Sequence, residues 1–283
     1  MKKVLAIVAA TMVAAPLAAA SAAPAPEARK TALIIGIGEY QGRTVSLPGS
    51  AGDAALLRDT LLANGWEDAN INYLVNETAT AANIRGALGW LVDQSTDDGF
   101  SVFAYSGHVK QKSGDLDGDG ELNDEFLWPH DNSFISDGEL AASLNALRGD
   151  AWINIAGCEA AGFDDGVNGP RRLFTAASHE PEKGYEHPEW QLSVHNGLMV
   201  RDALAGGQGD SDGNGAVSIQ EALAYTATIA PELTATQRYG PQHPYINGGD
   251  GGEWFLSPPP PPPAPPAADG GGLLSRLLGR LLG

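Results

Sequence analysis

The sequence predicts an α/β domain with a mostly parallel sheet and helices on both faces. Short apolar runs rich in β-branched residues recur along the chain, and segments with a helical apolar period separate them. Strands that alternate with helices form right-handed crossovers, which place the strands parallel and cover the sheet on both sides.

The first strand is predicted at residues 30–37, where the apolar run KTALIIGI ends at Gly38. A helix is predicted at 53–64, because four leucines share one helical face and Gly65 follows as a C-terminal stop. The second strand is predicted at 71–75. Strand, helix and strand therefore follow one another as the fold class requires.

The pattern continues to residue 229, interrupted by an Asp/Gly-rich insertion at 110–132. Ser136 and its neighbours supply an N-cap for the helix that follows the insertion. The further predicted strands are 100–105, 151–156 and 173–177, and the further predicted helices are 80–93, 137–147, 198–205 and 218–229.

Both ends of the chain differ in composition from this domain. Residues 1–22 predict a signal peptide for export to the periplasm or medium, since a short basic start precedes an apolar run and a small-residue cleavage pattern. A membrane anchor is the alternative, but Pro16 interrupts the run. The expected division is signal peptide 1–22, spacer 23–30, domain 31–256, Pro/Gly-rich linker 257–270 and tail 271–283.

The tail at 271–283 carries six leucines on one helical stripe, with Arg276 and Arg280 opposite. Such an amphipathic segment suits docking on a membrane surface or on a partner protein. A frayed tail is the alternative, because a short segment with several glycines is a marginal helix in isolation.

Charge and cysteine content narrow the classes of function. The net charge of −18 repels phosphate backbones and argues against a nucleic-acid partner. Cys158 is the only cysteine, so no disulfide can form within the chain. The thiol is therefore either a small buried apolar residue or a reactive group.

The placement of Cys158 favours a reactive group. The predicted strand 100–105 runs into Ser-Gly-His108, and the strand 151–156 runs into Gly-Cys158. One helix connects these strands, so both side chains are expected at the same edge of the sheet. A thiol with a neighbouring imidazole is sufficient for nucleophilic acyl transfer. The backbone N–H groups of Val109 and Cys158 are the expected oxyanion donors.

Several motifs occur in one order along the chain and together resemble the caspase and metacaspase peptidases over residues 31–256. They are ALIIG at 32–36, LPG at 47–49, YSGH at 105–108, DEFLWPHD at 124–131, ISDGEL at 135–140, GCEA at 157–160 and QHP at 242–244. The resemblance implies a caspase-like fold, a polypeptide substrate, a Cys158/His108 dyad and cleavage after a charged P1 residue.

Three positions depart from the family pattern. Val109 stands where these peptidases usually have glycine, and Ala156 stands where metacaspases commonly have the aspartate that helps to bind a basic P1 side chain. Asp53 is the remaining acid of that pair and is the predicted substrate-binding residue. The order Cys-Glu-Ala is also similar to legumain-type peptidases, which prefer other P1 residues.

Residues 210–221 match the calcium-binding loop of the EF-hand, with Gly215 at the sharp turn. A solvated acidic turn is the alternative. The predicted ligands are Asp210, Asp212, Asn214, Ala216 through its carbonyl, and Glu221.

A second acidic run at 115–120 begins the same pattern, but Phe126 stands where the bidentate carboxylate is needed. Separately, the metacaspase resemblance implies a calcium site near the cysteine, with Asp124, Asp137 and Asp165 as the matching acids. Calcium bound there would link the cation to activity by ordering the loop after Cys158.

The sequence therefore predicts an exported cysteine endopeptidase, calcium-dependent and with a basic P1 preference. The alternative is a catalytically inactive caspase-like module that binds calcium and a partner, which Val109 and Ala156 favour. Arg171 and Arg172 follow the cysteine strand and suggest a site of self-processing.

Overall fold

The computed structural model describes residues 28–259, apart from positions 117, 119, 121, 168, 170 and 250. The predicted signal peptide and amphipathic tail lie outside the described residues, as does most of the Pro/Gly-rich linker.

A six-stranded sheet forms the centre of the domain, in the order β11-β8-β7-β3-β1-β2. Neighbouring strands are parallel, except that β11 runs antiparallel to β8. The strands are β1 Lys30–Gly36, β2 Ile71–Val75, β3 Phe100–Ser106, β7 Asp150–Ala156, β8 Arg172–Ala176 and β11 Tyr245–Gly248. The predicted mostly parallel sheet is confirmed.

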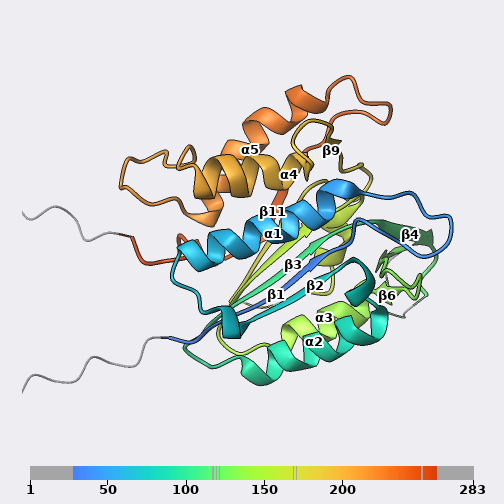
Figure 1. The fold of residues 1–283 in the computed structure, drawn as a ribbon, viewed down its shortest axis with the longest axis horizontal. Helices are drawn as coiled ribbons and strands as arrows, with labels where there is room; N and C mark the ends of the chain where they lie inside the picture. Colours follow the sequence, from blue (N-terminus) through green and yellow to red (C-terminus); the bar gives the residue numbers. More distant parts are fainter. Residues whose placement is uncertain are drawn as a thin grey trace, which may run out of the picture.

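Helices cover both faces of this sheet (Figure 1). Helices α1, α4 and α5 lie on one side, and α2 and α3 lie on the other. The helices are α1 Pro48–Ala63, α2 Ala81–Gln94, α3 Asp137–Asn145, α4 Val194–Asn196 and α5 Ile219–Thr234, with a π-helical segment η4 Gly197–Ala205 and short 3₁₀ turns η1 Asp68–Asn70, η2 Asn76–Thr78 and η3 Ala160–Asp164.

The alternation of side chains along β1 explains why both faces are covered. Leu33 and Ile35 pack into the core under α2 and α3, whereas Ala32 and Ile34 pack into the core under α1 and α5. All four side chains are at most 1% exposed. Full burial of one such aliphatic side chain stabilises the fold by roughly 1.5–3 kcal/mol, so the strand sequence alone requires two covering layers.

Two small antiparallel sheets lie beside the main sheet. One joins β4 Val109–Ser113, β5 Asn123–Leu127 and β6 Ile135–Ser136, and the other pairs β9 Glu186–His187 with β10 Leu192–Ser193. The sequence predicts none of these strands, because they are short and most of their residues are polar. They flank the ends of β3 and β7, where the candidate site is formed.

Helix α1 begins at Pro48, earlier than the leucine pattern at 53–64 predicts. Proline at the first helical position has no N–H to leave unpaired and a backbone angle suited to a helix. The N-cap residue Leu47 provides no side-chain cap, so the exposed N–H groups of the first turn need acceptors from elsewhere in the fold.

The far end of the described chain is anchored to the core. Leu256 is 3% exposed, and its carbonyl accepts hydrogen bonds from Trp66 Nε1 and Lys30 Nζ, both at 3.0 Å. The beginning of β1 and the segment around Leu256 therefore lie together at one end of the sheet.

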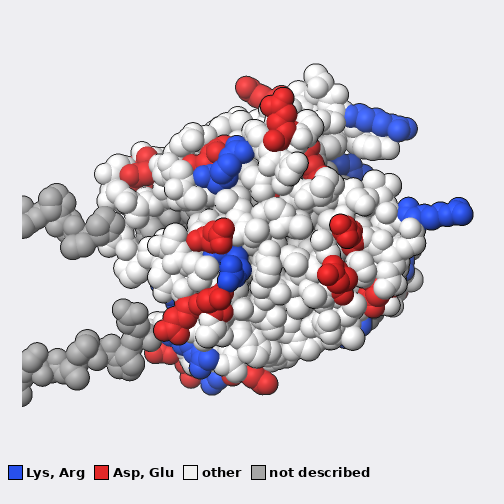
Figure 2. Space-filling view, in the orientation of Figure 1, with Lys and Arg blue, Asp and Glu red and all other residues white. Residues whose placement is uncertain are grey.

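Acidic and basic side chains are interspersed on the face shown in Figure 2, so the net negative charge is not gathered there into one patch. Within the described part of the chain, no helix combines the length and the apolar character needed to cross a bilayer.

Candidate active site

The register of β3 against β7 brings His108 and Cys158 to one edge of the sheet. Ser106 pairs with Ala156 as the two strands end, and His108 and Cys158 each lie two residues beyond that pair. Both side chains line the same cavity, which has a volume of about 100 Å³. The structure thus brings together the two residues that the sequence predicts as nucleophile and base.

Two tyrosines, the half-buried Tyr40 and the buried Tyr105, hold the backbone of His108. The N–H of His108 donates to the hydroxyl of Tyr40 at 2.7 Å, and the hydroxyl of Tyr105 donates to the His108 carbonyl at 2.6 Å. The imidazole lies beside the ring of Tyr40 at a centroid distance of 4.9 Å and beside that of Trp128 at 5.6 Å. Burial raises the pKa of both phenols, so both hydroxyls keep their protons.

A backbone carbonyl orients the imidazole. Nε2 of His108 donates to the carbonyl oxygen of Val45 at 2.8 Å. Because a carbonyl only accepts, Nε2 carries the hydrogen, and Nδ1 of the neutral ring is the atom that can accept a proton from a thiol. Burial lowers the pKa of His108, and the bond to Val45 partly offsets this effect. No residue type in the sequence marks such a carbonyl, so sequence reasoning missed it.

The thiol of Cys158 is half-buried and donates to the carbonyl of Gly184, with Sγ and the oxygen 3.7 Å apart. Burial raises the pKa of this thiol, and the Gly184 contact and the charge of Lys183 act in the opposite direction. Both effects favour a neutral thiol and a neutral imidazole in the resting pair. An attack by the sulfur would therefore require its proton to pass to Nδ1.

The turn that carries the predicted oxyanion donor requires glycine both within it, at Gly157, and in the segment packed against it, at Gly184. A Cβ on Gly157 would lie 2.7 Å from Cγ2 of Val109, and a Cβ on Gly184 would overlap the carbonyl oxygen of Gly157. Within the described part of the chain, the N–H of Cys158 donates to no protein acceptor, so it remains available to an oxyanion. The branched side chain of Val109 thus packs directly on the turn that presents this N–H.

A segment that we call the strap, residues 182–186, lies across the cysteine turn. Glu159 has left-handed backbone (φ 48°), its N–H donates to the carbonyl of Glu182 at 2.8 Å, and its carboxylate forms an ion pair with Lys183. Glu182 in turn accepts from Nδ1 of His243 at 2.8 Å. Sequence reasoning missed the strap, although it lies next to the nucleophile.

Asp53, the predicted substrate-binding residue, lies behind the cavity wall. It is 1% exposed, and it accepts from the hydroxyl of Ser106 at 2.7 Å and from the N–H of Ser193 at 3.0 Å. Both serines line the cavity, whereas Asp53 does not. Burial raises the pKa of Asp53, and the serine hydrogen bonds oppose this effect.

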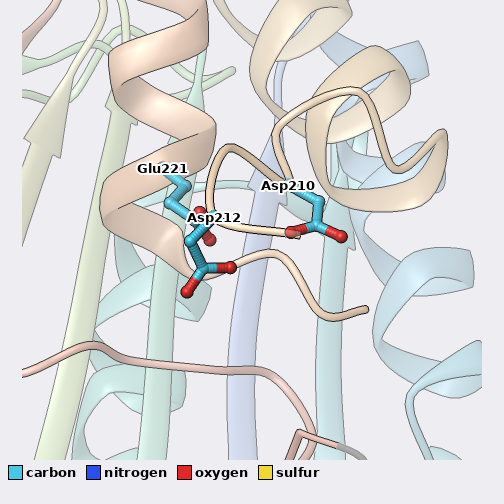
Figure 3. Close-up of side chains that lie close together, drawn as sticks. All are labelled: Asp210, Asp212 and Glu221. Carbon is cyan, nitrogen blue, oxygen red and sulfur yellow. The ribbon is translucent and has the colours of Figure 1, made fainter. Parts of the chain in front are cut away.

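The predicted calcium loop lies between η4 and α5, and Figure 3 shows its three carboxylates together. One oxygen each of Asp210, Asp212 and Glu221 lies within 4.8 Å of the others. The amide oxygen of Asn214 accepts from the N–H of Ala216 at 2.9 Å. The predicted ligands are thus gathered in one turn, but Asp210 lies beside Leu256 and hence near the beginning of β1, whereas Cys158 follows the end of β7.

Glu221 also caps helix α5. Its carboxylate accepts from the N–H of Ser211 at 3.0 Å and from the N–H of Ser218 at 2.9 Å. Burial raises the pKa of Glu221, but the hydrogen bonds from these two serines outweigh burial and lower it to about 2. The carboxylate is therefore fixed in its charged form, which is the form that binds a cation.

The acids of the second predicted calcium site surround a buried glutamate. Glu125 is fully buried, and its N–H donates to Asp137 at 3.0 Å. Burial raises the pKa of Glu125 to about 7, and the charges of Asp137 and Asp165 add to this effect. Its Oε2 has no hydrogen-bond partner within the described chain and lies against Gly162 in the turn after Cys158. Sequence reasoning missed Glu125, because its neighbour Asp124 is the residue that matches the family pattern.

Asp124, Asp137 and Asp165 do not form a cluster of the kind found at residues 210–221, as far as the described residues show. Asp124 is fully buried and accepts from the N–H of Leu116 at 2.8 Å, whereas Asp165 is exposed. An uncompensated buried carboxylate oxygen among further acids is nonetheless the donor set that a hard cation takes.

Arg172 does not lie in an open loop, which differs from the expectation for self-processing, whereas Arg171 is exposed in the turn before β8. Arg172 begins β8 and is 8% exposed. Its guanidinium donates to the carbonyls of Leu144 at 3.0 Å and Gly149 at 2.9 Å, at the end of α3. The peptide bond after Arg172 is therefore part of the central sheet.

Comparison with known proteins identifies the fold of the domain that carries this site. The caspase domain family model matches residues 29–194, which is more than half of the chain. A crystal structure of a Geobacter sulfurreducens protein superposes with a TM-score of 0.58 over 82% of this chain and 95% of that protein, at 14% identity. At this identity the superposition shows the fold alone.

Curated relatives match a shorter stretch. Metacaspase-3 of Arabidopsis thaliana is 34% identical over 38% of this chain and 32% of the relative, and metacaspase-1 of Candida albicans is 35% identical over 38% and 27%. Metacaspase-1 of Cryptococcus neoformans is 35% identical over 60% of this chain and 39% of the relative. The chain thus spans about a third of the length of these relatives. From the family match and the fold, the chain belongs to the caspase domain family of cysteine peptidases.

Proposed function

We propose that the chain is a cysteine endopeptidase that hydrolyses peptide bonds through Cys158 and His108. One observation carries the proposal: the only cysteine and an oriented histidine leave paired strands and line one cavity. The fixed hydrogen on Nε2 leaves Nδ1 to act as the base.

The reaction follows from this arrangement. Nδ1 of His108 takes the thiol proton as Sγ attacks the carbonyl carbon of the scissile bond, and the N–H of Cys158 donates to the oxyanion. The imidazolium then gives its proton to the leaving amine, the C–N bond breaks, and a thioester remains. Water, deprotonated by His108, attacks the thioester and releases the acid and the thiol.

We propose a basic P1 residue for this peptidase. Asp53 lies behind Ser106 and Ser193 and accepts a hydrogen bond from each of these two lining residues. It therefore orients polar groups of the cavity wall. No Lys or Arg is among the described residues that line the cavity. The electrostatic environment thus favours a cationic side chain.

We propose two distinct calcium effects. Calcium held by Asp210, Asp212, Asn214, Ala216 and Glu221 would stabilise the α5 end of the domain. Calcium near Glu125, with Asp124, Asp137 and Asp165, would supply the counter-charge that the buried carboxylate lacks and would order the turn at Gly162. The second effect is the one that would link calcium to activity.

Export and docking remain proposals that rest on the sequence. The basic and apolar start of the chain supports export by a signal peptide, and the leucine stripe at 271–283 supports docking on a membrane surface or a protein.

A catalytically inactive module that binds calcium and a partner is the second candidate. The packing of Val109 on Gly157 and the capping of the thiol by Gly184 favour it, because both restrict access to the nucleophile.

A peptide panel tests the proposal. Purified protein is incubated with calcium and with matched peptides that carry Arg, Asn or Asp at P1. Turnover that is lost in Cys158→Ala and retained in Ser113→Ala supports the peptidase. Absence of turnover and of thiol labelling in all conditions supports the inactive module.

A further inference from the structure

We propose that Asn132 is a positioning residue for the histidine base. Its carboxamide joins the loop that carries Val45 to the segment that carries Trp128, and it thereby holds the imidazole of His108 between these two groups. The inference rests on the proposed function. It adds to that function a residue that does not line the cavity.

The loop between β1 and α1 has little apolar burial of its own. Of residues 41–46 only Thr44 is not exposed, and Val45 is 72% exposed. The carbonyl of Val45 nevertheless accepts from Nε2 of His108 at 2.8 Å. Because side-chain burial does not place this carbonyl, hydrogen bonds to the rest of the fold must do so.

Asn132 binds this loop at two points. Its Nδ2 donates to the carbonyl oxygen of Gln41 at 3.0 Å, and its Oδ1 accepts from the hydroxyl of Thr44, the residue directly before Val45, at 3.1 Å. The N–H of Gln41 also donates to the carbonyl of His130 at 2.9 Å. The loop is therefore joined to the turn at 130–132 by both backbone and side chain.

The same carboxamide reaches the aromatic ring beside the imidazole. Oδ1 of Asn132 also accepts from Nε1 of Trp128 at 2.8 Å. This half-buried indole has its centroid 5.6 Å from that of the His108 ring. The carboxamide orientation suits its partners, because a carbonyl only accepts and an indole N–H only donates. One side chain thus acts on both the acceptor of Nε2 and the ring that the imidazole contacts.

The backbone of Asn132 lies in the left-handed region, with φ 58°. Among residues with a side chain, asparagine is one of those that adopt this region most readily. The N–H of Asn132 donates to the carbonyl of Pro129 at 3.0 Å and closes the turn between β5 and β6. Glycine would adopt the same backbone but would supply no carboxamide, so the side chain can be removed while the turn is kept.

Loss of the carboxamide should be detectable at the imidazole itself. Burial lowers the pKa of His108 and the bond to Val45 opposes this effect, so displacement of the Val45 carbonyl should lower the pKa further. It should also allow the neutral ring to exchange between its two tautomers. Titratable groups that contact His108 or share its cavity are not hydrogen-bonded to Asn132 in the described structure; they are Tyr40, Tyr105, Cys158 and Glu186.

Asn132→Gly tests the assignment. We expect kcat for a cleaved peptide to fall about tenfold, because the base is less often in the productive orientation, whereas KM should change less than about twofold. Gln191→Gly is the matched control, since Gln191 is also exposed and left-handed, with φ 53°. Thr44→Val removes one bond and should lower kcat about threefold, whereas Thr44→Ser keeps the hydroxyl and should match the parent protein.

A titration of the imidazole separates this proposal from the peptidase itself. The His108 ring is followed by NMR against pH in Cys158→Ala, with and without Asn132→Gly. A lower midpoint and mixed tautomers in the double variant support the role of Asn132 even if no peptide is cleaved. An unchanged midpoint and tautomer overturn it, even where kcat falls. Thr44→Val in the same background decides the question by the same criteria if Asn132→Gly does not fold.

Discussion

The candidate active-site edge and the predicted calcium loop are built in opposite ways. The edge collects its groups from distant parts of the chain, including Val45, His108, Cys158 and Glu186. The loop takes all its predicted ligands from residues 210–221. At the edge burial favours the neutral thiol and the neutral imidazole, whereas in the loop hydrogen bonds favour the charged form of the Glu221 carboxylate.

A site formed by one short motif can therefore be predicted from sequence together with all its residues. A site assembled by crossovers can be predicted only at those positions where a rare residue type, such as a lone cysteine, marks it. A lone cysteine after a strand marks the edge, but a carbonyl or a glutamate from a distant turn does not. The loop also lies near the beginning of β1, whereas the edge follows the end of β7, so each should change without the other.

Removal of the proposed base should reduce activity more than any other change discussed here for the two regions. His108→Ala should lower kcat for a cleaved peptide by about 10²–10⁴, because the thiol then lacks its proton acceptor. Calcium affinity of the loop, measured by calorimetry, should not change. His179→Ala is the matched control, since His179 is exposed and contacts Tyr245 rather than the thiol. A parallel loss of calcium affinity would break the separation of the two regions.

A substitution in the predicted calcium loop should have a smaller effect, on calcium affinity. Glu221→Gln should weaken calcium binding about tenfold or more, because this predicted ligand loses its charge. Calcium at a hundred times its Kd should raise the stability of the parent protein by about 2.7 kcal/mol, and this gain should shrink in the variant. Glu232→Gln, exposed on the same helix, is the control. A fall in kcat at saturating calcium, with the protein still folded, would contradict a purely stabilising role for this loop.

A shift in the midpoints of the pH profiles is the smallest of the expected effects. Burial disfavours the imidazolium, so the acid limb of kcat/KM should have its midpoint below 6.5, the ordinary pKa of histidine. Burial also disfavours the thiolate, so alkylation of Cys158 should have its midpoint above 9.0. Activity should therefore persist across the interval between the two midpoints. A midpoint above 6.5 for the acid limb would instead indicate an ion pair in the resting enzyme.

The sequence predicts the central strands and helices well because their signals are local. Mostly apolar runs mark β1, β3 and β7, and the predicted bounds differ from the observed ones by about a residue. The missed strands β4 and β5 carry the polar sequences VKQKS and NDEFL, whose burial depends on packing against the turn after Cys158. Full burial of both Asp124 and Glu125 contradicts any simple alternation along a strand.

The candidate site was predictable only in part. Cys158 and His108 follow from residue type and strand ends, and Asp53 follows from the family resemblance. The two tyrosines that hold His108, the Val45 carbonyl and Asn132 could not be predicted, because each acts through a loop or strand placed by the rest of the fold. Their roles depend on three-dimensional proximity that no spacing encodes.

The position of Leu256 beside Lys30 determines which face of the domain is accessible when the protein is immobilised on a support. Both residues lie at the amino ends of the parallel strands, whereas the cleft opens at the carboxyl ends, roughly 20 Å away along a seven-residue strand. A domain immobilised on a bead through the segment beside Lys30 or beside Leu256 would therefore present the candidate site away from the support. Large folded proteins could then reach it without steric obstruction from the support.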